Sequence, residues 1–363
     1  MKNALAAFAA TLGLVLAACG GAAAAPSSSP SSTAPRASAA PNAATSANPA
    51  PTKPESLPTV RVGVTGTQGE AGIYLAQAQG YFEQEGVKIA LNKTEQVQLP
   101  ELLAGQVDLA DTSVTPGFFN AAARNVGLKI IAPMARQDPQ ASGLFLAVRK
   151  DLVDGGKVKT NADLKGLKIA IANDQFKYVI DKAMQAGGHQ LADADLVTLD
   201  FQSMITSFGS KAIDAGLIPE PLVTAAVEKG LAVKLESVGQ IAPGTQQTVV
   251  VASAQFAANR DQTLKWVTAY LRGVRDYHGA FFKNQDRQQA VEILAKAVPV
   301  ADLALYDKMA YTAISPDGKT NIASLDDQMR WYVKAGLLPA PVDLATLVDA
   351  SLAEQAVAKL GAY

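Results

Sequence analysis

The sequence predicts an α/β protein built from two lobes, and length, local pattern and an internal repeat each contribute to that prediction. The chain has 363 residues, whereas a single hydrophobic core stops growing near about 250 to 300 residues. Residues 60–91 follow the order strand, polar loop, helix, turn and strand. Residues 102–131 and 208–235 share an order of elements, so two lobes of like build are expected.

The stretch 60–91 predicts the start of a parallel sheet. Residues 60–64 carry valine at every second position, as a half-buried strand does. The polar, glycine-rich run 65–69 ends that strand, and a helix follows that Gly80 closes as a left-handed cap. Small ligands lie at the carboxyl ends of parallel strands, where backbone N–H groups at a helix N-terminus are free. We therefore expect residues 65–68 to contact a ligand.

The internal repeat aligns Asp108 with Asp214, and Gly127 with Gly230 after a short gap. Each copy reads as a helix end, a short strand, a polar loop, a helix, a glycine cap and a strand. Two further apolar runs, 142–150 and 247–253, are typical of short strands. We expect these two strands to cross between the lobes and to form a hinge.

The carboxyl-terminal part of the chain predicts helices. One helix is expected from Asn259 to about Lys283, and another is expected to begin at the capping-box-like run from Ser324 and to end at Gly336. Trp266 and Trp331 fall inside these helices, so both are predicted to be packing residues.

The amino terminus predicts export and anchoring. An apolar run ends at Ala18 and is too short to span a bilayer. The residues before Cys19 resemble a bacterial lipobox, so residues 1–18 are predicted to be a lipoprotein signal peptide and Cys19 the lipidation site; a plain secretory signal is the alternative. Residues 19–58 are rich in Ala, Ser, Pro and Thr and predict a disordered linker. The protein is thus expected in the bacterial cell envelope, lipid-anchored on the extracytoplasmic face of a membrane.

Composition argues against several classes of function. The 32 Lys and Arg residues balance 33 Asp and Glu residues, so no basic footprint for nucleic acid is present. Cys19 is the only cysteine, which excludes a disulfide and a thiolate metal site. His189 and His278 are the only histidines, and neither belongs to a catalytic or metal-binding motif; we expect both on solvated surfaces. No catalytic residue, metal or cofactor is therefore predicted.

The run G-Y-F-E-Q-E-G-V-K-I, after a strand, a polar loop and a helix, resembles the start of a family of solute-binding proteins. These are the periplasmic-type receptors of ABC importers for nitrate, aliphatic sulfonates, taurine and thiamine-pyrimidine precursors. The resemblance covers about residues 59–363. It implies a type II periplasmic-binding-protein (Venus-flytrap) fold with a ligand cleft between two lobes. Lobe one would comprise residues 59–146 and 250–363, lobe two residues 147–249, and the partners would be a small solute and an ABC permease, with the receptor a monomer.

Loops expected to face each other across the cleft supply hydroxyls, amides and backbone N–H groups. The predicted ligand-binding residues are Thr65, Gly66, Thr67, Gln68, Asp111, Thr112, Ser113 and Arg136 from lobe one, with Asn173, Asp174, Gln202 and Glu220 from lobe two. Three of them are carboxylates, which would repel a purely anionic ligand, so a zwitterion or a neutral, amine-bearing ring fits better. Some of these residues could instead cap helices, as Asp174 is placed to do.

Two alternatives stay open beside a receptor for a sulfonate-, taurine- or pyrimidine-precursor-like solute. One is an enzyme of thiamine-pyrimidine biosynthesis, which resembles these receptors in fold but carries a motif rich in His and Cys that has no counterpart here. The other is a solute sensor that docks on a signalling receptor.

Overall fold

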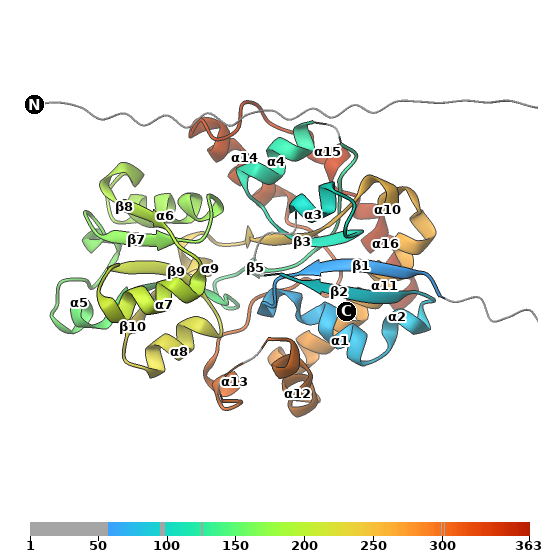
Figure 1. The fold of residues 1–363 in the computed structure, drawn as a ribbon, viewed down its shortest axis with the longest axis horizontal. Helices are drawn as coiled ribbons and strands as arrows, with labels where there is room; N and C mark the ends of the chain where they lie inside the picture. Colours follow the sequence, from blue (N-terminus) through green and yellow to red (C-terminus); the bar gives the residue numbers. More distant parts are fainter. Residues whose placement is uncertain (1–56, 95–98, 125, 299, 301) are drawn as a thin grey trace, which may run out of the picture. The chain divides into compact units, whose positions relative to one another are not determined.

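Two five-stranded mixed sheets, with helices packed on them, form the framework of the protein (Figure 1). The computed structural model describes residues 57–94, 99–124, 126–298, 300 and 302–363. The predicted signal peptide, Cys19 and the predicted linker up to residue 56 lie outside the described residues.

The first sheet has the strand order β2-β1-β3-β12-β4, and the second has the order β10-β6-β9-β7-β8. The strands are β1 (Thr59–Val64), β2 (Lys88–Lys93), β3 (Leu109–Ser113), β4 (Lys129–Pro133), β5 (Arg136–Gln137), β6 (Leu144–Arg149), β7 (Lys168–Ile171), β8 (Asp195–Thr198), β9 (Ala215–Pro219), β10 (Ala232–Ser237), β11 (Thr245–Gln246) and β12 (Thr248–Ala252). In the first sheet, β1 runs parallel to β2 and β3, while β12 is antiparallel to β3 and β4. In the second sheet, β7 runs parallel to β8 and β9, while β6 is antiparallel to β9 and β10.

The predicted repeat is confirmed, because the two sheets share one topology. Asp108 precedes β3, and its carboxylate accepts a hydrogen bond from the backbone N–H of Arg61 (2.8 Å). Asp214 precedes β9 and accepts in the same way from the N–H of Lys168 (3.0 Å). The equivalent aspartates therefore fix equivalent pairs of parallel strands, and the prediction of an α/β fold with two similar halves is correct.

The strands predicted to form the hinge lie elsewhere. β6 is inside the second sheet and β12 is inside the first, so neither strand crosses between the sheets. The crossings are the segments 134–143 and 238–247, which are joined by the antiparallel pair β5 and β11. All five residues of β12 are buried, which explains the apolar signal of that run. The crossing segments are rich in polar residues, so they lack the apolar run by which a strand is predicted from sequence.

The helices are α1 (Ala71–Ala78), α2 (Tyr81–Gln84), α3 (Leu99–Leu103), α4 (Pro116–Ala123), α5 (Lys150–Asp154), α6 (Gln175–Ala186), α7 (Phe201–Ser210), α8 (Leu222–Glu228), α9 (Val238–Ile241), α10 (Ala254–Ala258), α11 (Arg260–Phe282), α12 (Arg287–Ala297), α13 (Leu305–Lys308), α14 (Ile322–Lys334), α15 (Leu344–Leu347) and α16 (Ala350–Leu360). Short 3₁₀ helices cover Gln68–Glu70 (η1), Asn161–Asp163 (η2) and Leu191–Asp193 (η3). Within the described ranges, no helix combines the length and the apolar character needed to cross a bilayer.

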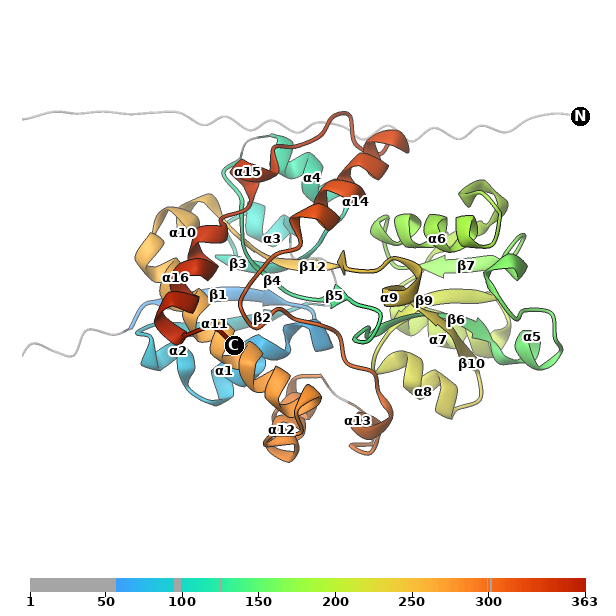
Figure 2. The same ribbon diagram turned by 180° about the vertical axis from the view of Figure 1, so that it is seen from behind.

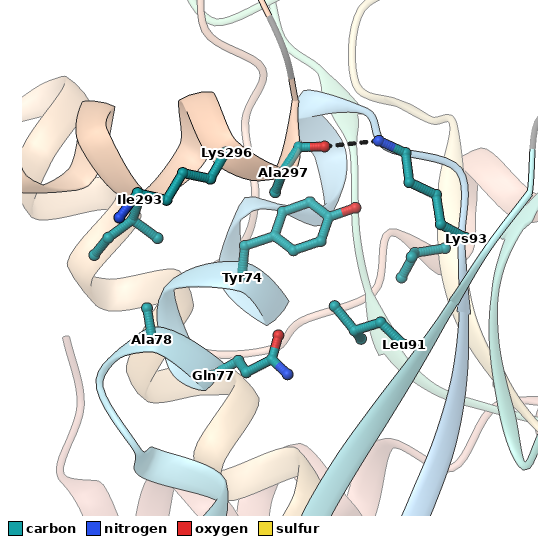
Figure 3. Close-up of a pocket in the computed structure, with 9 residues that line it drawn as sticks. Tyr74, Gln77, Ala78, Leu91, Lys93, Ile293, Lys296 and Ala297 are labelled. Atoms are coloured by element: carbon teal, nitrogen blue, oxygen red, sulfur yellow. Dashed lines mark hydrogen bonds between the residues drawn. The ribbon is translucent and has the colours of Figure 1, made fainter.

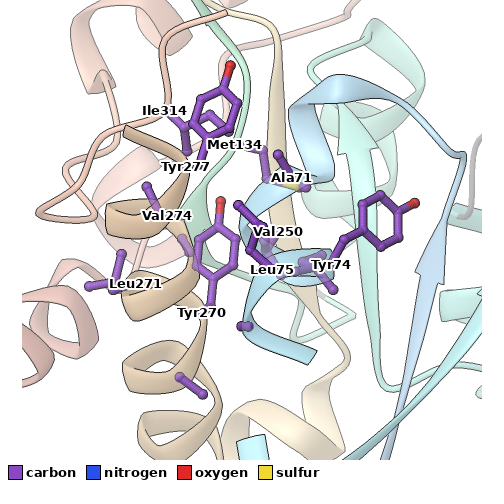
Figure 4. Close-up of a cluster of buried hydrophobic side chains, with 14 of the residues drawn as sticks. Ala71, Tyr74, Leu75, Met134, Val250, Tyr270, Leu271, Val274, Tyr277 and Ile314 are labelled. Atoms are coloured by element: carbon purple, nitrogen blue, oxygen red, sulfur yellow. The ribbon is translucent and has the colours of Figure 1, made fainter. Parts of the chain in front are cut away.

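Helix α11 carries one face of the first sheet's core (Figure 4). Its side chains Trp266, Tyr270 and Tyr277 are fully buried, and Trp266 stacks on Tyr270 with ring centroids 5.3 Å apart. Glycines let α11 approach α1 closely, since a Cβ on Gly273 would lie 2.1 Å from the carbonyl oxygen of Gly72. The predicted packing role of Trp266 is confirmed.

Two helix predictions had different outcomes. The helix predicted from Asn259 to about Lys283 is confirmed as α11, with the Asn259 side chain accepting from the N–H of Gln262. The predicted start of α14 was wrong. The helix begins at Ile322, and Asn321 rather than Ser324 is its cap. Asn321 supplies an acceptor for the N–H of Ser324 (3.2 Å), so the cap lies one turn earlier than the sequence pattern indicated.

Candidate functional site

Two residues predicted to bind ligand, one beside each sheet, hydrogen-bond to the backbone of the same residue, Ala310. The backbone N–H of Ala310 donates to Glu220 Oε1 (3.2 Å), and its carbonyl accepts from Gln68 Nε2 (3.2 Å). Gln68 Oε1 also accepts from the N–H of Thr312 (3.0 Å). Gln68 lies just after β1 of the first sheet, and Glu220 follows β9 of the second. The segment around Ala310 therefore lies between the two groups.

Helix α13 brings that segment to the second sheet. Figures 1 and 2 both draw α13 beside α8, and Lys308 forms an ion pair with Glu228 of α8 (2.6 Å). The pair is half-exposed, so it contributes little stability by itself. Its effect is positional, because it places the chain that follows α13 against Glu220.

The β1–α1 loop is organised around Glu70, a residue that sequence reasoning missed. The Glu70 carboxylate is fully buried and accepts from the backbone N–H groups of Thr65 (2.5 Å), Gly66 (2.8 Å) and Thr67 (3.0 Å). The hydroxyls of Thr65 (3.0 Å) and Tyr74 (2.5 Å) donate to it as well. These backbone N–H groups are those expected to be free for a ligand. That expectation was wrong, since the chain's own carboxylate occupies them.

Asp111 extends this cluster into the first sheet. It lies in the middle of β3, is buried, and is hydrogen-bonded to both Glu70 and Thr248. Burial raises the pKa of Asp111 well above its ordinary value, and the neighbouring Glu70 charge raises it further. Its Oδ1 atom is buried without a hydrogen-bond partner among the described residues. Burial and the neighbouring Glu70 carboxylate thus favour the protonated form of Asp111.

Replacing Asp111 with asparagine is expected to remove a pH dependence of stability. In the folded state the raised pKa keeps Asp111 protonated, whereas the unfolded chain ionises near its ordinary pKa of about 3.9. Wild-type stability is therefore full below that pKa and falls as pH rises toward the folded pKa, by up to about 1.4 kcal/mol per pH unit. In urea unfolding between about pH 4 and about pH 8, the free energy of unfolding of Asp111→Asn should rise relative to that of wild type as pH rises.

The control for that experiment is Thr112→Val, a change of similar shape in the same strand without a titratable group. Its effect on the free energy of unfolding should be the same at each pH. Parallel pH profiles for wild type and Asp111→Asn would contradict the buried protonated state.

In the second sheet, Glu220 is the buried centre of a smaller cluster. Its side chain has no exposed surface, and Oε1 lies 2.6 Å from Lys234 Nζ. The N–H of Thr224 also donates to Glu220 (3.3 Å), and Lys234 lies over the ring of Phe145. Glu220 is therefore satisfied by partners within the chain.

The remaining predicted residues are spread over several local roles. Arg136 forms an ion pair with Asp138 (2.6 Å), and Asp174 forms one with Lys177 (2.8 Å). The expectation that Asp174 caps its helix was wrong: its side chain makes no capping hydrogen bond, and Asn173 Oδ1 accepts from the N–H of Gln175 instead. Of the other members, Thr112 is buried in β3, Ser113 is half-buried at its end, and Gln202 is exposed on α7.

A glutamine network between the sheets was also missed. Gln175, at the start of α6, donates from Nε2 to the carbonyl of Gln247 (2.9 Å) and to Gln328 Oε1 (3.0 Å). Gln137 of β5 donates to the side chains of Gln247 and Thr312. Gln175 Oε1 is buried and has no partner among the described residues. A run of glutamines directly before a buried strand was the available signal.

Two cavities are present among the described residues, and the first borders the Glu70 cluster through Tyr74. One of about 400 Å³ is lined by residues of β1, β2, α1 and α12, with Tyr74, Leu91 and Ala297 among them, and Lys93 Nζ donates to the carbonyl of Ala297 (2.9 Å; Figure 3). The other, of about 560 Å³, lies between α6 and α14. Neither cavity is lined by a residue predicted to bind ligand.

The histidines and acids give no metal centre. No group of three or more His, Cys, Asp or Glu side chains suited to a metal ion occurs within the described ranges. His189 is half-buried and Nε2 lies 2.9 Å from the carbonyl oxygen of Ala162. His278 is half-buried on α11 and stacks on the exposed ring of Phe282 with ring centroids 4.8 Å apart.

Residues 68–279, more than half of the chain, match the family model described as NMT1/THI5 like. A protein of Brucella abortus named as a binding protein is 27% identical over 198 residues, which are 51% of this chain and 60% of that protein. YtlA of Bacillus subtilis, also named as a binding protein, is 24% identical over 83% of this chain and 90% of its own length. The alignment thus spans less than two thirds of the Brucella protein.

Solved structures share the fold. The aliphatic sulphonate binding protein SsuA of Escherichia coli has a TM-score of 0.64 at 21% identity, covering 80% of this chain and 92% of SsuA. The nitrate-binding protein NrtA of Synechocystis has a TM-score of 0.69 at 14% identity, covering 84% of this chain and 89% of NrtA. The desulfurization enzyme DszB has a TM-score of 0.60 at 11% identity, covering 84% of this chain and 99% of DszB. The two sheets are those of a type II periplasmic-binding-protein fold, and the chain belongs to the NMT1/THI5-like family.

Proposed function

We propose that this protein is the solute-binding component of an ABC importer and delivers a small organic solute to the permease. The observation that carries the proposal is the convergence of Gln68 and Glu220 on the backbone carbonyl and N–H of Ala310. These side chains come from two sheets of one topology that are joined by a short pair of crossing strands. A protein built in this way can close around a small molecule by moving one half against the other.

The proposal assigns the first sheet to lobe one and the second sheet to lobe two. The boundaries then fall in the crossings 134–143 and 238–247, because the expected boundaries at 146–147 and 249–250 would divide β6 and β12. Solutes of the sulfonate, taurine or pyrimidine-precursor classes are the candidates, because related folds include proteins named for sulfonate and nitrate binding. The receptor would act as a monomer.

Catalysis is the second candidate, and one fold neighbour, DszB, is an enzyme. The acids of the site argue for binding instead. Glu70 and Glu220 are each held by several donors from the chain, and no histidine contacts either of them among the described hydrogen bonds. A general acid or base needs a titratable group within hydrogen-bond reach of its substrate.

The test is to identify the small molecule that copurifies with the protein by mass spectrometry and to titrate it back by calorimetry. Gln68→Ala should weaken binding by about 1 to 3 kcal/mol, because a buried hydrogen-bonding group is lost. Gln84→Ala, on the exposed surface of α2, is the matched control and should bind as wild type does. A folded protein that binds no small molecule would contradict the proposal, and chemical change in the bound molecule would favour the enzyme.

We further propose that Cys19 carries a lipid anchor that holds the receptor at the outer face of the membrane, with residues 19–58 as its tether. Cys19→Ser should release the protein from the membrane fraction or leave it unprocessed, since the acceptor thiol for the diacylglycerol is lost. Metabolic labelling with a fatty acid and cell fractionation measure this. Equal membrane association of the variant and wild type would contradict the anchor.

A further inference from the structure

We propose that Glu70 is a built-in anion that fills an oxyanion-type site, so that it selects a solute with no anionic group at the β1–α1 loop. The inference rests on the proposed function and names the class of solute. That class is uncharged or positively charged and rich in N–H or O–H donors. Of the candidate solutes, it retains the pyrimidine precursors and excludes sulfonates and taurine, which carry an anionic sulfonate group.

The donors around Glu70 have the arrangement of a bound oxyanion. Three consecutive backbone N–H groups, from Thr65 to Thr67, converge on its two oxygens, and two hydroxyls complete the set. Successive backbone N–H groups that form such a concavity are typical anion sites. Here the anion is supplied five residues or fewer along the same chain.

The carboxylate is held in the loop by the hydrogen bonds from Thr65, Gly66, Thr67 and Tyr74. Gly66 has φ +82°, a backbone conformation that favours glycine, so the turn around the carboxylate requires this residue. Glu70 itself has no exposed surface and is hydrogen-bonded to Asp111 on its inner side. A sulfonate or nitrate would have to expel a buried carboxylate to use these donors.

Three cations of the candidate site are paired with carboxylates. Arg136 is bound to Asp138, Lys234 to Glu220, and Lys177 to Asp174. Lys93, beside the loop, donates to the neutral carbonyl of Ala297, and no carboxylate among the described residues forms an ion pair with it. An anionic solute at this loop would thus meet the buried carboxylate of Glu70 with Lys93 as the one cation at hand among these four residues.

The unpartnered groups also favour a solute that donates hydrogen bonds. Gln175 Oε1 and Asp111 Oδ1 are buried oxygens without a partner in the described part of the chain. Buried oxygens of this kind are stabilised by a donor, which a neutral or cationic solute can supply.

The experiment is to remove the internal anion and supply an external one. When formate, acetate or methanesulfonate is added to Glu70→Ala in the full chain, the melting temperature should rise and calorimetry should detect binding. Wild type should show neither effect. Glu70→Gln fills the same space, so it should gain no anion binding. Glu83→Ala removes an exposed carboxylate of α2 and should respond to anions as wild type does.

If Glu70→Ala folds only when an oxyanion fills the site, refolding in formate should recover the protein and refolding in chloride should not. Equal behaviour in both salts, or binding of methanesulfonate or nitrate by wild type, would overturn the inference. An anionic solute that copurifies with wild type would overturn it while leaving the proposed receptor intact. If wild type binds no solute, the proposed receptor function is contradicted. The anion response of Glu70→Ala would still test whether Glu70 fills an anion site.

Discussion

Replacing Gly273 with alanine is expected to lower the free energy of unfolding by about 3 kcal/mol, at the upper end of the range for overpacked cores. The new Cβ would lie 2.1 Å from the carbonyl oxygen of Gly72 and 2.7 Å from the backbone nitrogen of Ala76. Both are backbone atoms of α1, so they cannot move aside as a flexible side chain would. Helices α1 and α11 would have to separate, which loosens the contacts of Tyr270 and its neighbours. Urea unfolding followed by circular dichroism measures the change.

Gly209→Ala is the matched control, because it is the same substitution in a helix with open space. The nearest atom to a Cβ there is 3.9 Å away, on Leu231, and the residue is exposed in α7. Alanine restricts the unfolded chain more than glycine does, so this variant should be as stable as wild type or more stable by up to about 1 kcal/mol. Equal losses for both variants would show that the close contact at Gly273 is not the cause.

Glu220→Ala is expected to cost about 3 kcal/mol of stability, because it leaves buried donors without their acceptor. The side chain of Glu220 is fully buried, and its removal strands Lys234 and the N–H groups of Thr224 and Ala310. Breaking a buried pair from one side costs about 3 to 5 kcal/mol. A quarter of the Lys234 side chain is exposed, so water can solvate part of the charge and the lower end applies.

The double variant Glu220→Met with Lys234→Met separates the cost of an unpaired charge from the value of the pair. It should recover most of the loss, because two apolar side chains of similar length leave no buried charge. Guanidinium unfolding of the wild type, Glu220→Met, Lys234→Met and the double variant gives the coupling free energy between the two side chains. A double variant as unstable as Glu220→Ala would indicate that the hydrogen bond to Ala310, which joins the two halves, supplies the stability.

Much of the fold could be predicted because its signals lie within short stretches of chain. Valine at alternate positions in residues 60–64 specifies a strand with one buried face, and that strand is β1. The repeat around Asp108 and Asp214 was visible because each aspartate binds the backbone of an equivalent neighbouring strand. Helix α11 was predicted almost to the residue, since its cap and its buried face are both local.

The site was predicted less well, and Glu70 shows why. Thr67 and Glu70 have the spacing of a capping box, and that signal was available in the sequence. Spacing alone does not tell that the same carboxylate would also take the N–H groups of Thr65 and Gly66, because this depends on how the loop turns around Gly66. The loop was correctly located, yet its hydrogen-bonding groups were assigned to a ligand.

The sequence by itself determined the elements, the two similar halves and the family, because burial periodicity, turn residues and motifs are properties of contiguous residues. Only the tertiary structure decided which polar groups meet. Gln68 and Ala310 are 242 positions apart, and the hydrogen bond between them exists because α13 carries the chain across to α8. A hydrogen bond depends on distance and direction within a few tenths of an ångström, which no local pattern encodes.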